Sequence, residues 1–193
     1  MIQLPQPDLS GTVSLERAIA GRRSIRNFTK RKITASELSL LLWAAQGITE
    51  PIGGGRSAPS AGATFPLNTY LFTGDGVFQY ENRQHALRKL SDKDMRSALS
   101  AVALHQQCVL SAPVSFLFTA IAERTTSRYG DRGVMYIHME AGHAAQNLHL
   151  QAVALGLGSV PVGAFDEKEV AGLLELDSSE TPLYIVPVGE AEI

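Results

Sequence analysis

The chain has 193 residues, 45% of them hydrophobic, which is enough to bury a core and predicts one domain over residues 1–193. Its formal net charge of −2 favours neither nucleic acid nor an anionic membrane as a partner. The single Cys108 excludes an internal disulfide framework, and the start at Met1 lacks a signal-peptide pattern, so we expect a cytoplasmic protein with no membrane span.

The first quarter of the chain predicts an arm, two helices and a loop. Residues 1–13 have the pattern of an extended arm, and Ser14–Ala20 that of a short amphipathic helix. A capping box, in which the threonine is followed three residues later by Glu37, predicts a helix over Thr34–Gln46. Residues 47–63 contain three consecutive glycines and predict a long loop, which is typical of functional or disordered segments.

The middle of the chain predicts a hairpin and a buried strand. Alternating residues over Leu67–Thr73 and Val77–Tyr80, with a Gly-Asp-Gly turn between them, indicate two paired strands. A helix is expected over about Asp92–Leu104, capped by Ser91. The nearly continuous apolar run Val114–Ile121 predicts a central strand.

The last third predicts a long helix, a short helix and a final strand. The long helix should extend from Asp131 to Leu155, and its small residues around Gly142 favour a central or interface position. A short helix should follow Asp166, and the last strand should cover Leu183–Val188. Hairpins outside a simple β-α-β alternation predict an α+β fold.

The segment Arg22-Arg23-Ser24-Ile25-Arg26 places three guanidinium groups and a hydroxyl within five residues. Arginine binds phosphate well because its planar fork can meet two oxygens at once. The alternative is a solvated basic surface, which is the commoner role of such charge runs.

Other familiar chemistries find less support. His138, His143 and His149 lie five and six residues apart on one helix, and the outer pair would be separated by about 16 Å, so one metal ion cannot be held by both. We therefore expect no metal site. A G-x-S-x-G nucleophile motif, a Rossmann glycine motif and a P-loop are all absent from the sequence.

Two further segments complement the arginines. Pro59–Ala63 offers a backbone of small residues against which a flat ring could lie, and Gly158–Phe165 is punctuated by glycines whose N–H groups could meet ring heteroatoms. A planar cofactor with a phosphate tail needs these parts together.

These segments resemble the signatures of the nitroreductase family of FMN-dependent oxidoreductases. Arg22–Phe28 resembles the N-terminal signature, and Pro59–Pro66 is similar to the second signature in the form found in its SagB-type (azoline dehydrogenase-like) branch. Ala141–Leu148 and Gly163–Asp166 resemble the central dimer helix and the flavin-contacting turn. The resemblance covers nearly the whole chain and implies a central, mostly antiparallel sheet flanked by helices in a domain-entwined homodimer.

The resemblance also implies FMN contacts for individual residues. Arg22, Arg23 and Ser24 would hold the phosphate and ribityl chain, and Arg26 would lie near the pyrimidine edge of the flavin. The second subunit would contribute Pro59, Ser60, Ala61, Gly62 and Ala63. The flavin ring would lie beside the chain at Pro161, Val162, Gly163 and Ala164. A backbone N–H of Gly163 or Ala164 would reach the flavin atom N5.

Two departures from the family pattern concern the cofactor. The chain ends in the acidic stretch Val188–Ile193, where family members usually place a basic residue near the phosphate, so binding should depend more on Arg22 and Arg23. Ala63 stands where many nitroreductases carry asparagine.

The resemblance implies a ping-pong enzyme that uses NAD(P)H to reduce nitro compounds, quinones or similar small-molecule acceptors. No side chain need act as acid or base, because the flavin carries the chemistry. One alternative is a SagB-like flavin enzyme that oxidises azolines in modified peptides. The sequence offers no clear catalytic Lys-Tyr pair for that reaction, and the unpaired candidates Tyr80 and Tyr129 fit structural roles better. Another is a non-enzymatic flavin-binding or flavin-sequestering protein.

Overall fold

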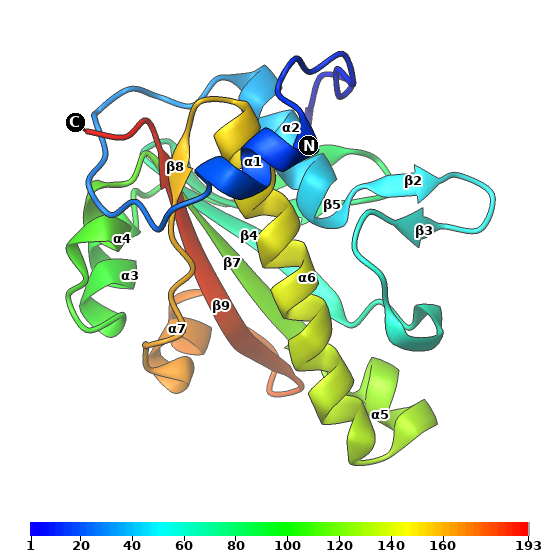
Figure 1. The fold of residues 1–193 in the computed structure, drawn as a ribbon. Coiled ribbons are helices and arrows are strands. Elements are labelled where there is room, and N and C mark those ends of the chain that lie inside the picture. Colours follow the sequence, from blue (N-terminus) through cyan, green and yellow to red (C-terminus); the bar gives the residue numbers. More distant parts are fainter. Residues whose placement is uncertain (193) are drawn as a thin grey trace.

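The computed structural model describes residues 1–192. Its centre is a seven-stranded antiparallel sheet with the strand order β1-β6-β5-β4-β7-β9-β8 (Figure 1). The strands of this sheet are β1 (Ile2–Gln3), β4 (Leu67–Thr73), β5 (Gly76–Glu81), β6 (Ala86–Ser91), β7 (Val114–Ile121), β8 (Gly158–Ser159) and β9 (Glu180–Gly189). The helices are α1 (Leu15–Gly21), α2 (Ala35–Gln46), α3 (Arg96–Val102), α4 (Gln107–Ser111), α5 (Glu123–Tyr129), α6 (Arg132–Ala154) and α7 (Glu167–Leu173). This architecture confirms the predicted α+β class and antiparallel sheet.

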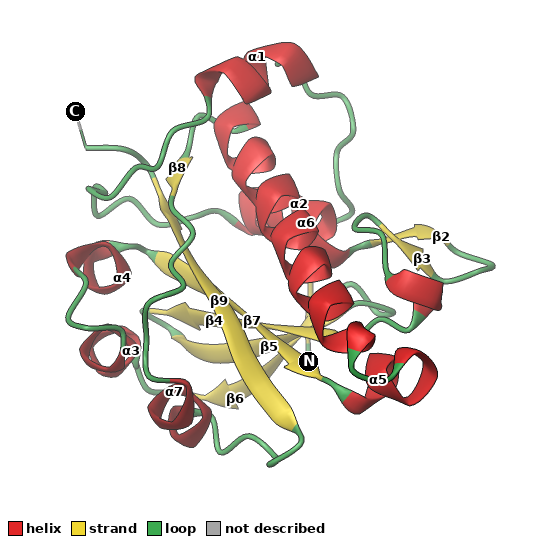
Figure 2. Ribbon diagram, turned by 60° about the horizontal axis from the view of Figure 1, so that its bottom comes forward, coloured by secondary structure: helices red, strands yellow, loops and turns green. Residues whose placement is uncertain are grey.

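Helices cover both faces of the sheet. Figure 2 shows α1, α2 and α6 on one side and α3, α4 and α7 on the other, with α5 beside the start of α6. The apolar core divides in the same way, because successive side chains of a strand point to opposite faces. Phe116 and Phe118 of β7 pack in the cluster of α2 and α6, whereas Leu117 packs in that of α3, α4 and α7. The run 114–121 is therefore a central strand buried on both faces, as predicted.

The sequence signals for the ends of α2, α6 and α7 are confirmed. Thr34 Oγ1 accepts a hydrogen bond from the Glu37 N–H, and the Glu37 carboxylate accepts one from the Thr34 N–H, which completes the predicted capping box of α2. Asp166 caps α7. Helix α6 agrees with its prediction to within one residue at each end. Among residues 1–192, no helix is both long enough and apolar enough to cross a bilayer.

The prediction of an unstructured loop over residues 47–63 is wrong. The segment forms a small hairpin from β2 (Ile48–Glu50) and β3 (Gly55–Arg56), followed by a 3-10 turn, η1 (Ala61–Ala63). Gly54 adopts φ +72°, which a glycine tolerates and which lets the chain reverse between the two short strands. The three glycines therefore mark a turn.

The predicted start of the third helix is also wrong. Ser91 does not cap it, because Ser91 is paired with Val77 as the last residue of β6. The chain then turns, the Asp94 carboxylate accepts the Arg96 N–H, and α3 begins at Arg96. Besides the elements within 47–63, β6, α4 and α5 were not predicted.

The N-terminal arm is tied to the sheet. Residues Ile2 and Gln3 pair with β6, and the Leu4 N–H donates to the His85 carbonyl at 3.2 Å. The His85 ring contacts Tyr80 Oη at 2.7 Å and Ser39 Oγ at 2.7 Å. The predicted extended arm is therefore the edge strand of the sheet rather than a free segment.

Gly158 should be sensitive to any side chain. A Cβ built there lies 2.7 Å from both Cβ and Cγ2 of Ile25, so Gly158→Ala forces β8 and the segment carrying Ile25 apart. We expect a loss of about 1–3 kcal/mol in unfolding free energy, seen as a lower Tm by circular dichroism. Gly11→Ala is the matched control, because nothing lies within 4 Å of its added Cβ. Equal Tm values for the two variants would contradict this packing.

Candidate functional site

The arginine segment leaves α1 and docks on the end of the sheet at β8. Arg22 is the C-cap of α1, and its N–H donates to the Ala18 carbonyl. Two residues later Ser24 forms a parallel bridge with Ser159, and the Ile25 N–H donates to the Ser159 carbonyl at 3.0 Å. The segment is thereby fixed against β8 by backbone contacts, and its arginine side chains are left outside the core.

All three arginine side chains of the segment are held by uncharged acceptors. Arg23 Nη1 donates to the carbonyls of Ala20 at 3.0 Å and Arg22 at 2.7 Å, and Arg26 Nη1 donates to the Ser24 carbonyl at 3.4 Å. Arg22 Nη1 lies 3.1 Å from Nε2 of His149. Within residues 1–192 none of the three forms an ion pair with a carboxylate. Their positive charges therefore remain uncompensated at one place on the surface, which an anion would occupy favourably.

His149 was not predicted as a site residue. It lies on α6, is only 2% exposed, and its Nδ1 is hydrogen-bonded to Ser159 Oγ. Arginine can only donate, so Nε2 must accept and Nδ1 must carry the proton. Burial, and secondarily the positive charge of Arg22, lower the pKa of His149 to about 4. The ring is therefore neutral near pH 7.

The predicted ring-facing turn follows the strand against which the arginine segment docks. Residues 160–162 follow β8 directly, and Val162 exchanges backbone hydrogen bonds with Ile185 of β9 at 2.7 and 3.0 Å. Gly163 and Ala164 are exposed, and their N–H groups donate to no other residue of the described chain 1–192. The Ala164 carbonyl accepts from Gln106 Nε2 at 2.9 Å, which fixes the turn. Two free N–H groups are thus presented on a fixed backbone.

The second predicted segment, Pro59–Ala63, lies elsewhere in the chain. The Gly62 carbonyl accepts from Arg128 Nη1 at 3.1 Å, so η1 packs beside α5 and the first half of α6. The residue of α6 that interacts with Ser60 is Glu140, nine positions before His149, which is about 14 Å along the helix. Within one chain, the arginine segment and the segment 158–165 are therefore joined at β8, whereas Pro59–Ala63 lies apart from both.

Glu140 is a buried carboxyl beside this second segment. It is 3% exposed, and its Oε1 has no hydrogen-bond partner within residues 1–192. Burial raises the pKa of Glu140 to about 7, while Ser60 and the guanidinium of Arg56 act in the opposite direction. Arg56 is itself tied to Gln46 Oε1 at 2.7 Å. The sequence contains no local signal for this cluster, because its members come from α2, β3 and α6.

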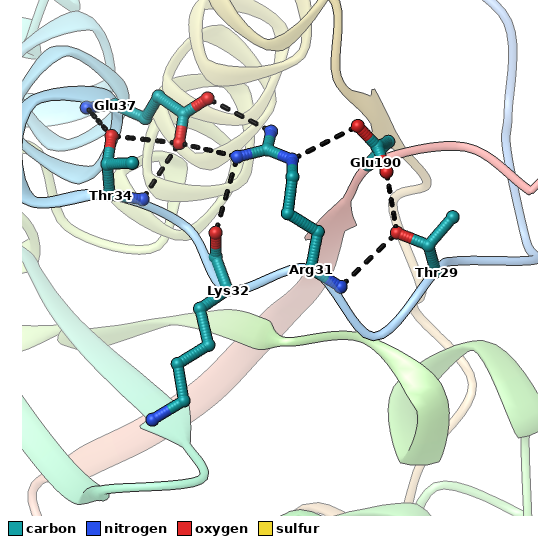
Figure 3. Close-up of polar contacts among 6 residues, drawn as sticks. All are labelled: Thr29, Arg31, Lys32, Thr34, Glu37 and Glu190. Atoms are coloured by element: carbon teal, nitrogen blue, oxygen red, sulfur yellow. Dashed lines mark hydrogen bonds and ion pairs between the residues drawn. The ribbon is translucent and has the colours of Figure 1, made fainter.

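The acidic end of the chain has its own partners. Glu190 accepts from Arg31 Nε at 3.1 Å and from Thr29 Oγ1 at 2.8 Å, and Arg31 also binds both oxygens of Glu37 (Figure 3). These bonds fasten the end of β9 to the stretch that follows the arginine segment. Arg31 divides its single positive charge between Glu190 and Glu37, so these three groups together keep a net negative charge.

A cavity of about 630 Å³ lies at a different place, between the start of α2, the β4–β5 hairpin and α4. It is lined by apolar side chains such as Leu71 and Phe78, with Lys30, Lys32 and Arg96 near them. None of the thirteen residues predicted to contact FMN lines this cavity. The candidate flavin residues therefore do not belong to this cavity.

Comparison with known proteins identifies the family of the chain. A model of the Nitroreductase family matches residues 19–190. A protein of Methanocaldococcus jannaschii assigned to the nitroreductases is 40% identical over 194 positions, covering 97% of this chain and 96% of that protein. The FMN reductase [NAD(P)H] of Bacillus subtilis is 25% identical over 186 positions, covering 89% of this chain and 61% of the reductase.

Comparison with solved structures identifies the same family. The crystal structure of a protein of Ralstonia eutropha assigned to the nitroreductases matches with a TM-score of 0.90 and 28% identity. The match covers 100% of this chain and 90% of that one. The antiparallel sheet flanked by helices is therefore the fold of the nitroreductase structures.

Glu140 and His149 should give opposite pH dependences of stability. Between pH 4.5 and about 7 the folded chain keeps a proton on Glu140 that the unfolded chain loses, so the free energy of unfolding falls as pH rises, by at most about 3 kcal/mol. Between pH 4 and 6.5 the unfolded chain binds a proton at His149 that the folded chain does not, so stability rises with pH by a similar amount, about 3 kcal/mol.

Urea denaturation between pH 4.5 and 6.5 separates the two effects. The wild type should vary little, Glu140→Gln should become more stable as pH rises, and His149→Gln should become less stable. His105→Asn, at an exposed histidine outside α6 whose positive φ asparagine tolerates, is the control and should follow the wild type. Parallel curves for all four proteins would show that neither buried group titrates as described.

Proposed function

Because the chain belongs to the nitroreductase family, we propose that it is an FMN-dependent oxidoreductase that transfers two electrons from NAD(P)H to a small-molecule acceptor, such as a nitro compound or a quinone. The observation that carries this proposal is the pairing of three uncompensated arginines with two free backbone N–H groups at one end of the sheet. The anionic tail of a ligand would pair with the arginines, and heteroatoms of its ring would accept hydrogen bonds from the N–H groups.

The residues present fit FMN at this position. Arg22, Arg23 and Ser24 would take the phosphate and the ribityl chain, since charge-assisted bonds to phosphate are among the strongest that side chains make. Gly163 and Ala164 would offer their N–H groups to the ring. Bound FMN supplies the redox chemistry, accepting hydride from NAD(P)H and passing two electrons to the acceptor in a ping-pong cycle.

The chain's own residues would bind FMN, orient its ring and polarise it. Arg26 is fixed through the Ser24 carbonyl and would place a permanent positive charge at the pyrimidine edge, where it favours a negatively charged reduced ring. Pro161 and Val162 would form the wall that sets the height of the ring above β9. No proton donor from a side chain is required for this arrangement.

A homodimer would complete the site. Within one chain, Pro59–Ala63 lies beside Glu140 in the first half of α6, whereas Arg22 contacts His149 in the second half, so the two segments are separated. A two-fold contact through α6 would bring this segment to the partner's arginines. The helix supports such a contact: Val134, Met135 and Met139 are 46%, 44% and 49% exposed, and Gly142 has open space around it. Exposed apolar side chains gathered on one helix favour a buried interface.

The first measurement is an absorption spectrum of protein saturated with FMN, desalted, and then treated anaerobically with NADH or NADPH. We expect flavin to be retained and to bleach with at least one nucleotide. Retained flavin that does not bleach would favour the azoline dehydrogenase or the flavin carrier over the reductase. Protein that retains no flavin would contradict the proposal.

Removing two charges from the arginine segment should abolish most of the FMN affinity. Arg22→Ala combined with Arg23→Ala removes bonds worth roughly 1.5–3 kcal/mol each, so the Kd for FMN should rise by more than about a hundredfold in a fluorescence titration. Lys89→Ala combined with Lys93→Ala changes the net charge equally on and after β6, far from β8 in the sheet order, and should leave the Kd unchanged. Equal affinities for both double variants would refute the phosphate assignment.

A bulky residue at Gly142 should separate the subunits. Nothing lies within 4 Å of an added Cβ at Gly142, so Gly142→Arg should fold, remain monomeric by light scattering and fail to retain FMN. Gly172→Arg, at an equally open glycine of α7, should stay dimeric. The wild-type interface should bury more than about 2,000 Å². A wild-type monomer at micromolar concentration, or a dimeric Gly142→Arg, would contradict the interface.

A further inference from the structure

The chain holds its arginines in two different ways. Arg31, Arg88 and Arg96 each form an ion pair with at least one carboxylate, and Arg31 binds two, as Figure 3 shows. Arg22 is bound by the neutral ring of His149 instead. Both arrangements fix a guanidinium, but only the carboxylates cancel its charge.

This difference decides what Arg22 can still do. A carboxylate at the position of the imidazole would form a strong ion pair and leave little net attraction for a second anion. The neutral imidazole uses one of the five N–H donors of Arg22, and the side chain's Nε and Nη2 donate to no residue within 1–192. Arg22 is thereby immobilised with its full charge and most of its donors unused.

Ser159 keeps the ring in the required form. The hydroxyl accepts from Nδ1, which leaves Nε2 unprotonated and able to accept from Arg22. With the proton on Nε2, two N–H groups would face each other and the contact would be lost. Ser159 is also the residue whose backbone pairs with the arginine segment at Ser24 and Ile25. One residue of β8 therefore sets both the path of the segment and the tautomer of the histidine beneath it.

We propose that His149, oriented by Ser159, is a positioning residue that presents Arg22 in its fully charged state to the phosphate of the flavin cofactor. His149 and Ser159 act through Arg22 and do not touch the flavin ring. It should therefore determine how strongly the protein prefers FMN over riboflavin, which lacks the phosphate. This inference rests on the proposed function, because it takes the ligand of Arg22 to be the FMN phosphate.

Three substitutions at His149 distinguish a neutral acceptor from simple packing. Gln can accept from Arg22 through its side-chain oxygen and stay neutral, Leu fills space without accepting, and Glu accepts but carries a negative charge. The Kd values for FMN and for riboflavin are measured by fluorescence titration of flavin-free protein at pH 7.5, and the Tm of each variant is recorded.

His149→Gln should stay within a few-fold of the wild type for both flavins. His149→Leu should weaken FMN by about 10- to 100-fold, as expected for loss of an oriented charged bond, and leave riboflavin unchanged. His149→Glu should weaken FMN at least as much, although Arg22 stays bonded. Ser159→Ala should lower the FMN preference less than His149→Leu, because the ring keeps its place but loses its fixed tautomer.

Two results would overturn the inference. Equal losses for FMN and riboflavin in His149→Leu would indicate a packing role, and wild-type FMN affinity in His149→Glu would show that neutrality is irrelevant. If His149→Leu does not fold, the FMN affinities of His149→Gln and His149→Glu decide whether a neutral acceptor is required.

Failure of the proposed function itself is recognised separately, as wild-type protein that binds neither flavin. Inorganic phosphate then serves as the probe, with the Arg22 Nε–H followed by NMR. A chemical-shift change on adding phosphate that is seen in the wild type and in His149→Gln but is absent in His149→Glu would support the role of His149. The absence of any response in the wild type would overturn it.

Discussion

The candidate site depends on one short contact between distant parts of the chain, the parallel pairing of Ser24 with Ser159. It holds the arginine segment against β8, and the turn that contains Gly163 follows β8 after three residues. Gly158 allows the approach, because a side chain there would overlap Ile25. Without this contact the cations and the free N–H groups would have no fixed relation to each other. The contact therefore converts two weak sequence signals into one surface suited to an anion attached to a ring.

Electrostatics divides the arginines near this contact into structural and ligand-directed ones. Arg31 joins Glu37 at the start of α2 to Glu190 after β9, so it ties two chain segments together and is neutralised in doing so. This also changes the meaning of the acidic C-terminus. The sequence suggests that an acidic residue replaces a basic phosphate contact, and the structure shows that the Glu190 carboxylate is bound by Arg31, which it shares with Glu37. In the proposed function, binding of the phosphate would fall to Arg22, Arg23 and Arg26, which form no ion pair within residues 1–192.

Local signals predicted much of the fold and part of the site. Caps such as Thr34 and Asp166, and the alternation of the β4–β5 hairpin, depend on neighbours within a few residues and were read correctly. Strand β6 was missed because exposed polar residues such as Lys89 dilute its pattern. His149 and Glu140 were missed for another reason. Helical periodicity can place them on a buried face, but their partners lie far away in the sequence and become neighbours only through the fold.

Helix α6 links the two halves of the proposed site. Its C-terminal half supports Arg22 through His149, and its N-terminal half places Glu140 against the segment that would meet the partner's flavin. Between them lies Gly142, which is exposed and has no side chain, so two such helices could approach closely there. In the dimer that we propose, each α6 would thus support one half of both sites. A change in the packing of this helix would then reach both flavins at once, which makes cofactor binding and subunit association a single coupled equilibrium.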